Sequence, residues 1–122
     1  MRITELTDGP AILYCEGREL GVIRVAASHR ARYRGLLGAD AIDDALLLLK
    51  TNSVHTIGMR FPIDVAYLSR TLKVIDVIHM KPNRWSRNRL TARHTLETFS
   101  GRFADWQIER GTQLTIEPLS RS

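Results

Sequence analysis

The sequence predicts an α+β fold: a compact, mainly antiparallel β-barrel or sandwich of about six or seven strands with one short covering helix. Short β-prone runs follow one another closely along the chain, and only one segment has the cap, spacing and terminator of a proper helix. Alternating βαβ units would need more helix than this. With 122 residues, 43% of them hydrophobic and 25% charged, the chain is typical of one globular domain spanning residues 1–122.

The first half of the chain is predicted to hold three strands and the helix. Residues 11–15 and 20–26 are β-prone and flank residues 16–19, where Gly17 can adopt a positive φ, so they predict an opening hairpin. Ser28 is a candidate N-cap for a helix over residues 29–37 that Gly38 ends. The apolar run ALLLLK then predicts a strand that is buried on both faces near the centre of the sheet.

The second half is predicted to add three or four strands. Residues 61–68 and 73–80 alternate apolar and polar positions and predict a hairpin over residues 69–72. Because that connection lacks Gly and Asn, we expect a longer or type I turn, and its register stays open. The remaining predicted elements are a strand at 95–99, a single helical turn at 101–106, and a last strand at 113–117 that Pro118 ends.

The net charge of +5 is concentrated in one segment. Residues 81–93 contain five cations and no acid, and without them the chain has 13 basic and 13 acidic residues. Pro and Asn residues break any periodicity there, so we expect an exposed loop. This loop can bind phosphates or carboxylates, with an aromatic ring for stacking, through Arg84, Trp85, Arg87 and Arg89. The alternative, which we favour from sequence, is a solvated connection whose arginines pair with acids elsewhere.

Several short motifs stand in a fixed order along the chain. They are RGLLG at 34–38, FPID at 61–64, KP at 81–82, LE at 96–97 followed by Gly101, and Gly111-Thr112. In this order they resemble domain-of-unknown-function family 192 over about residues 18–117, although no single motif is diagnostic. The resemblance implies a compact β-rich α+β domain. It implies no substrate, cofactor or reaction, because the family is named for lacking one.

Asp64 is the first candidate for chemistry, because a carboxylate on a predicted strand is costly to bury without a partner. We favour Arg34 of the predicted helix as that partner, in an ion pair that fixes helix against sheet, and we also count Arg34 among the candidate ligand-binding residues. The alternative is a catalytic pocket in which Asp64 and Glu97 act as acid and base and His55 carries the proton.

Other kinds of site have little support in the sequence. There is no HExxH, GxSxG or P-loop motif, so we expect no metal and no cofactor. The single Cys15 lies in an apolar run that is typical of an inert core thiol. No apolar run approaches the length of a membrane span, and the acidic N-terminal residues Glu5 and Asp8 do not fit a secretory signal, so we expect a cytoplasmic protein.

The sequence therefore predicts a non-catalytic binding or accessory module for an acidic ligand or partner, which is an acidic small molecule, a nucleic acid or a protein. Two alternatives stay open. One is a small hydrolase or lyase with a carboxylate and histidine pocket, and the other is a protein-interaction domain that uses an exposed strand edge. We expect a monomer or weak dimer.

Overall fold

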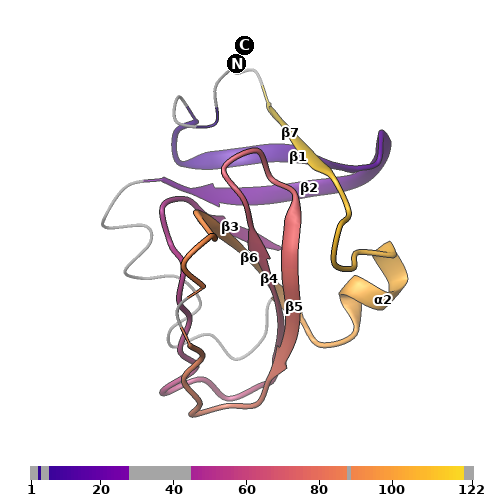
Figure 1. Cartoon of the computed structure of the whole chain (residues 1–122). Helices are drawn as coiled ribbons and strands as arrows, with labels where there is room; N and C mark the ends of the chain where they lie inside the picture. The colour runs from indigo at the N-terminus through magenta and orange to yellow at the C-terminus, as the bar shows by residue number, and fades with distance from the viewer. Residues whose placement is uncertain (1–2, 4–5, 28–44, 88, 120–122) are drawn as a thin grey trace.

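The strands form one curved sheet in a computed structural model that describes residues 3, 6–27, 45–87 and 89–119. The elements in chain order are β1 (Gly9–Cys15), β2 (Arg18–Ala26), β3 (Leu46–Leu48), β4 (Ile63–Leu68), β5 (Val74–Met80), β6 (His94–Phe99), α2 (Arg102–Trp106) and β7 (Leu114–Pro118). The seven strands follow the order β5-β4-β6-β3-β2-β1-β7, and Figure 1 shows β1 and β2 running across the direction of β4 and β5. All neighbours are antiparallel except β2 and β3. The predicted β-rich α+β fold is confirmed.

The helical content of the described residues is small. The helix α2 forms the single turn predicted at 101–106, and it buries Phe103 and Trp106 against the sheet. The helix predicted over residues 29–37, which includes Arg34, lies outside the described residues. No helix in the described part of the chain is long and apolar enough to cross a membrane.

The opening hairpin has a two-residue turn, shorter than the connection expected from sequence. Glu16 and Gly17 both have positive φ values, 50° and 82°, and Arg18 already pairs with Cys15. This is the geometry of a type I′ turn, whose twist matches that of the flanking strands. The Glu16 carboxylate also accepts a hydrogen bond from the backbone N of Gln113 at 2.9 Å, which ties the turn to the start of β7.

The β4–β5 hairpin corrects one detail of the sequence interpretation. Simple alternation along residues 73–80 places Val74 on the same face as Asp76 and Met80. The register instead shifts between Tyr67 and Leu68, which leaves Ile75 as an extra residue and sends Val74 to the opposite face. A β-bulge of this kind arises from strand pairing, which sequence periodicity does not encode.

Apolar clusters lie on both faces of the sheet. The larger cluster joins β1, β2 and α2 to one face of β4 and β6, and a second one packs against the other face of β4 around Val65, Tyr67 and Met80. All six residues of β4 and all three residues of β3 are therefore buried. As the sequence predicts, β3 is buried on both faces and is the central strand.

The two edge strands of the sheet, β5 and β7, meet at one end without forming a ladder. An isolated antiparallel bridge joins Lys73 to Gln113, and the Gln113 side chain donates to the carbonyl oxygen of Thr71 at 2.7 Å. The backbone N of Leu114 also donates to the carbonyl oxygen of Leu72 at 3.1 Å. The sheet thus remains open, with its edges tied at a single point.

Candidate anion-binding site

The basic segment 81–93 is held beside residues 51–59 by buried polar groups. Thr56 is fully buried, and its hydroxyl donates to the carbonyl oxygen of Lys81 at 2.6 Å and accepts from the backbone N of Arg84 at 2.8 Å. Further along, the backbone N of Ser86 donates to the carbonyl oxygen of Val54 at 2.9 Å. The inward groups fix the path of the segment, so its charged side chains are left on the outside.

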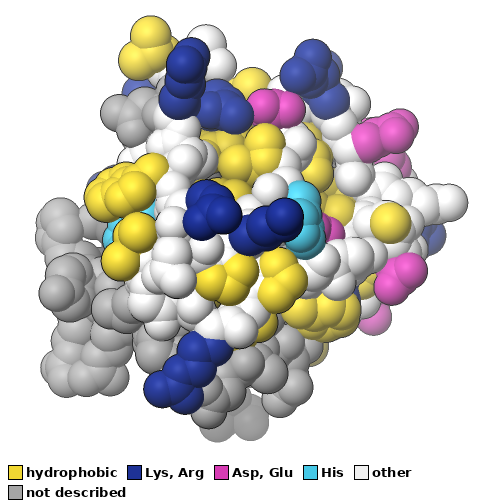
Figure 2. Space-filling view, turned by 90° about the horizontal axis from the view of Figure 1, so that it is seen from below, with side chains coloured by type: hydrophobic (Ala, Val, Ile, Leu, Met, Phe, Trp, Pro, Cys, Tyr) yellow, Lys and Arg dark blue, Asp and Glu magenta, His cyan; other side chains and the backbone are white. Residues whose placement is uncertain are grey.

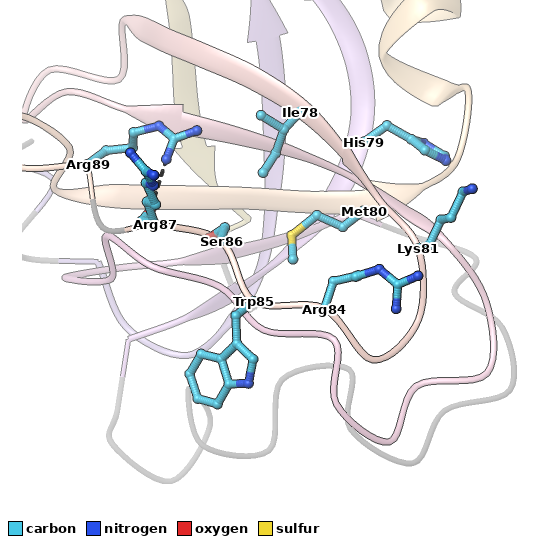
Figure 3. A pocket seen from close by; sticks show the side chains of 9 residues that line it. All are labelled: Ile78, His79, Met80, Lys81, Arg84, Trp85, Ser86, Arg87 and Arg89. Atoms are coloured by element: carbon cyan, nitrogen blue, oxygen red, sulfur yellow. Dashed lines mark hydrogen bonds between the residues drawn. The ribbon is translucent and has the colours of Figure 1, made fainter.

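A pocket of about 380 Å³ lies between this segment and the edge strand β5. Ile78 and Met80 line it from β5, and Ser86 lines it from the basic segment (Figure 3). Its other lining residues are cationic or aromatic: His79, Lys81, Arg84, Trp85, Arg87 and Arg89. The structure thus brings together the four binding candidates that the sequence places in the segment, and it adds two neighbours. None of the described lining residues is acidic.

Arg89 is the cation of this pocket that is already paired. Its guanidinium lies 3.2 Å from a carboxylate oxygen of Asp76 and 4.7 Å from the centre of the Tyr67 ring. Arg110 binds the other oxygen of Asp76 at 3.3 Å. Burial alone would raise the pKa of Asp76, yet hydrogen bonds from Arg110 and Arg89 hold this pKa below its ordinary value. For Arg89, pairing with an acid elsewhere in the chain is therefore what the structure shows.

Lys81, Arg84 and Arg87 are different, because none of them contacts a carboxylate of the described residues. All three are exposed, and among the described residues the Arg84 guanidinium donates only to the backbone carbonyl oxygens of Pro82 and Asn83, each at 3.3 Å. Figure 2 shows Lys and Arg side chains gathered beside a histidine on one face of the molecule. This surface therefore carries positive charge that no described neighbour neutralises.

Trp85 stands at the rim of the pocket, and 73% of its surface is exposed. His55 lies next to it, with 4.8 Å between the ring centres, and a backbone bridge joins the two residues. The Nδ1 atom of His55 accepts from the backbone N of Ile57 at 3.3 Å. His55 thus supports an aromatic neighbour and a local turn.

Asp64 caps the start of α2. Its Oδ2 atom accepts hydrogen bonds from the backbone N of Gly101 at 2.9 Å and of Phe103 at 3.3 Å, and its Oδ1 atom lies 3.2 Å from Nδ1 of His79. The residue is only 8% exposed. A partner for the buried carboxylate was expected, and backbone amides and a histidine provide it. The Arg34 expected in that role lies outside the described residues.

Asp64 and Glu97 do not share a pocket. In the pairing of β4 with β6, Asp64 stands opposite Thr98, while Val65 stands opposite Glu97. Because successive side chains of a strand point to opposite faces, the two carboxylates point away from each other across the sheet. Glu97 lies in the row Val65–Glu97–Leu46, where burial raises its pKa to about 7. The structure therefore does not assemble Asp64, Glu97 and His55 into an acid–base site.

The described part of the chain contains neither a reactive cysteine site nor a metal site. Cys15 is a free, buried thiol, and burial raises its pKa, so the thiolate is disfavoured. Among the described residues, no three His, Cys, Asp or Glu side chains are grouped so as to hold a metal ion.

Sequence reasoning missed three residues that shape the pocket. Lys81 belongs to the run of cations and was identifiable from that position alone. His79 gives no signal of a lining role in the sequence, and its side chain, on the edge strand β5, is 49% exposed. Thr56 carries no signal in the sequence, because its role depends on tertiary contacts with Lys81 and Arg84.

Comparison with known proteins identifies the family. The sequence profile of DUF192, described as Uncharacterized ACR, matches residues 15–116. No curated protein matches the chain significantly. A "putative transcription regulator" from Sinorhizobium meliloti 1021 has a TM-score of 0.74 at 15% identity, over 92% of this chain and 97% of that one. A protein of unknown function from Novosphingobium aromaticivorans has a TM-score of 0.72 at 14% identity, over 93% of this chain and 88% of that one.

Identities this low show a shared fold and nothing about ligand or reaction. The profile match carries more weight, because it spans most of the 122 residues and agrees with the order of motifs found in the sequence. The chain belongs to the DUF192 family.

Proposed function

We propose that this domain is a binding module for an anionic ligand or partner, and that the pocket beside β5 is its binding site. The observation that carries the proposal is the set of three lining cations, Lys81, Arg84 and Arg87, with no carboxylate partner among the described residues. Like charges that share a concave surface repel one another in the free protein, and an anion relieves this repulsion when it binds.

The fixed path of the segment adds to this argument. Thr56 and Ser86 hold the backbone on either side of Trp85 through buried hydrogen bonds. The cations are therefore displayed from an ordered backbone, which lowers the conformational entropy lost when a ligand binds. Arg89 is held at one wall by Asp76, so the three unpaired cations are the ones we expect to contact the ligand.

The alternative functions have less support. A hydrolase or lyase would need Asp64, Glu97 and His55 in one pocket, and the strand pairing separates the two carboxylates. A strand-edge interaction domain would use β5 or β7, and the Lys73–Gln113 bridge already occupies the end where these two edges meet. A cytoplasmic location also belongs to the proposal, supported by a lone cysteine that is buried and free.

Titration with inorganic tripolyphosphate tests the site. We expect the triple variant Lys81→Ala, Arg84→Ala, Arg87→Ala to lose at least about tenfold in affinity, and binding to the unaltered chain to weaken as salt rises. The charge-matched control is Arg24→Ala, Arg70→Ala, Lys73→Ala, which removes three exposed cations away from the pocket and should leave affinity within about twofold. Absence of binding, or equal losses in the two triple variants, would contradict the proposal.

A further inference from the structure

The exposed ring of Trp85 is a feature that anion binding does not explain. A tryptophan that is 73% exposed leaves most of a large apolar surface in water, where it gains nothing by packing. The ring is nevertheless supported: the plane of His55 lies at 37° to it, and the backbones of the two residues form a bridge. The structure thus presents an aromatic surface that is held in place and open to a second flat group.

The cations that line the pocket lie at its two ends. In Figure 3, Lys81 and Arg84 extend at one end, and Arg87 lies beside Arg89 at the other, with Met80 between them. A ligand with one charged group would engage one end alone. A ligand with negative charges repeated along its length can engage both ends.

Resting on the proposed anion-binding function, we propose that the ligand is a single-stranded nucleic acid, with phosphates on Lys81, Arg84 and Arg87 and a base stacked on Trp85. Single strands are bound by this combination of a basic groove and an exposed aromatic ring, since every base offers a flat face. In a duplex the bases are already stacked on one another, so Trp85 would find no free face. An acidic peptide matches the charge and leaves the ring unused.

The test of base stacking compares two labelled strands of equal length, an oligothymidylate and an abasic strand with the same backbone, by fluorescence anisotropy. We expect the oligothymidylate to bind about tenfold more tightly. Trp85→Ala should remove this difference and leave the abasic strand's affinity unchanged, while Trp85→Phe should keep most of it. Because Trp85 is exposed, both variants should melt at the temperature of the unaltered protein.

The test of phosphate contacts uses the salt dependence of the same binding. For single strands, each phosphate contact contributes about 0.7 to the slope of log affinity against log salt. The double variant Arg84→Ala, Arg87→Ala should therefore lower that slope by about 1.4 for both strands. The matched control, Arg70→Ala, Lys73→Ala, should leave the slope as it is.

Each outcome separates this inference from the proposed function. Equal affinity for the two strands, no binding of either, or full affinity in Trp85→Ala overturns the nucleic-acid assignment. If tripolyphosphate still binds through Lys81, Arg84 and Arg87, the anion-binding function survives that failure. An oligoglutamate that binds as tightly as the oligothymidylate indicates an acidic protein partner and likewise overturns the assignment.

Discussion

Two buried titratable residues, Glu97 and His94, shift their pKa values in opposite directions. Burial raises the pKa of Glu97 from 4.5 to about 7. Burial, helped by the positive charges of Arg93 and Lys50, lowers the pKa of His94 from 6.5 to about 4. The Nδ1 atom of His94 accepts a hydrogen bond from the backbone N of Lys50 at 3.0 Å, a role that only the unprotonated nitrogen can fill. Both side chains are therefore neutral in the folded protein near pH 5.5.

Replacing Glu97 by Gln should reveal the contribution of His94 to the pH dependence of stability. Glu97 keeps its proton up to about pH 7 in the folded protein but loses it above about pH 4.5 in the unfolded chain. Its contribution to the free energy of unfolding is therefore full below pH 4.5 and falls by about 3 kcal/mol as the pH rises to 7. Glu97→Gln removes this fall. Urea unfolding of the variant should then show stability rising with pH between about 4.5 and 6.5. A variant whose profile matches that of the unaltered chain would contradict the burial effect.

Replacing His94 by Asn should have the opposite effect. The contribution of His94 to the free energy of unfolding is full above pH 6.5, its pKa in the unfolded chain, and falls by about 3 kcal/mol as the pH drops to about 4. It falls because the unfolded chain binds a proton at His94 over this range and the folded chain does not. An Asn oxygen can still accept from Lys50. We expect the variant's stability to fall as pH rises over that range. The stability of the unaltered chain should change little over this pH range, since the contributions of Glu97 and His94 change in opposite directions. A steep change in its stability with pH would contradict this cancellation.

At the scale of elements, the hydrophobic pattern and turn residues place the strands well. The apolar run of β3 and the Gly17 turn were predictable because burial and backbone conformation act locally. The bulge at Ile75 was not, since it depends on how β5 pairs with β4. The partners of Asp64 were also hidden, because its carboxylate reaches from β4 to the first amides of α2, 37 and 39 residues away.

Removing the Asp64 carboxylate should destabilise the start of α2. Asp64→Ala leaves the amides of Gly101 and Phe103 without an acceptor, at a cost of about 2 kcal/mol in the free energy of unfolding, and Asp64→Asn should cost about half as much. Hydrogen exchange at these two amides should speed up in both variants. The control Asp105→Asn, in the exposed part of the same helix, should change stability by less than about 0.5 kcal/mol. Unchanged hydrogen exchange at these two amides in Asp64→Ala would contradict the capping role of Asp64.

At the scale of the whole molecule, composition and the uneven charge distribution point to the region of the proposed site but not to its architecture. The excess of cations in residues 81–93 marks the segment where we propose that an anion binds. The pocket, however, needs β5 as a second wall and the buried hydroxyl of Thr56 as an anchor, and both come from other parts of the chain. Sequence also treats Arg84, Arg87 and Arg89 alike, whereas folding pairs Arg89 with Asp76. Only the tertiary structure separates the cations of the proposed site from Arg89, which has a structural role.

The contact between Lys73 and Gln113 has a consequence for self-association. An open sheet invites a second copy to align against its margin, and repetition of that step builds fibres. Here one end of each margin is occupied by the other, because the backbone N of Leu114 donates to the carbonyl oxygen of Leu72, the backbone N of Val74 donates to that of Thr112, and the Gln113 side chain donates to that of Thr71. A second copy that aligns along this end of the margin must first displace these contacts, so the native structure disfavours fibre growth there.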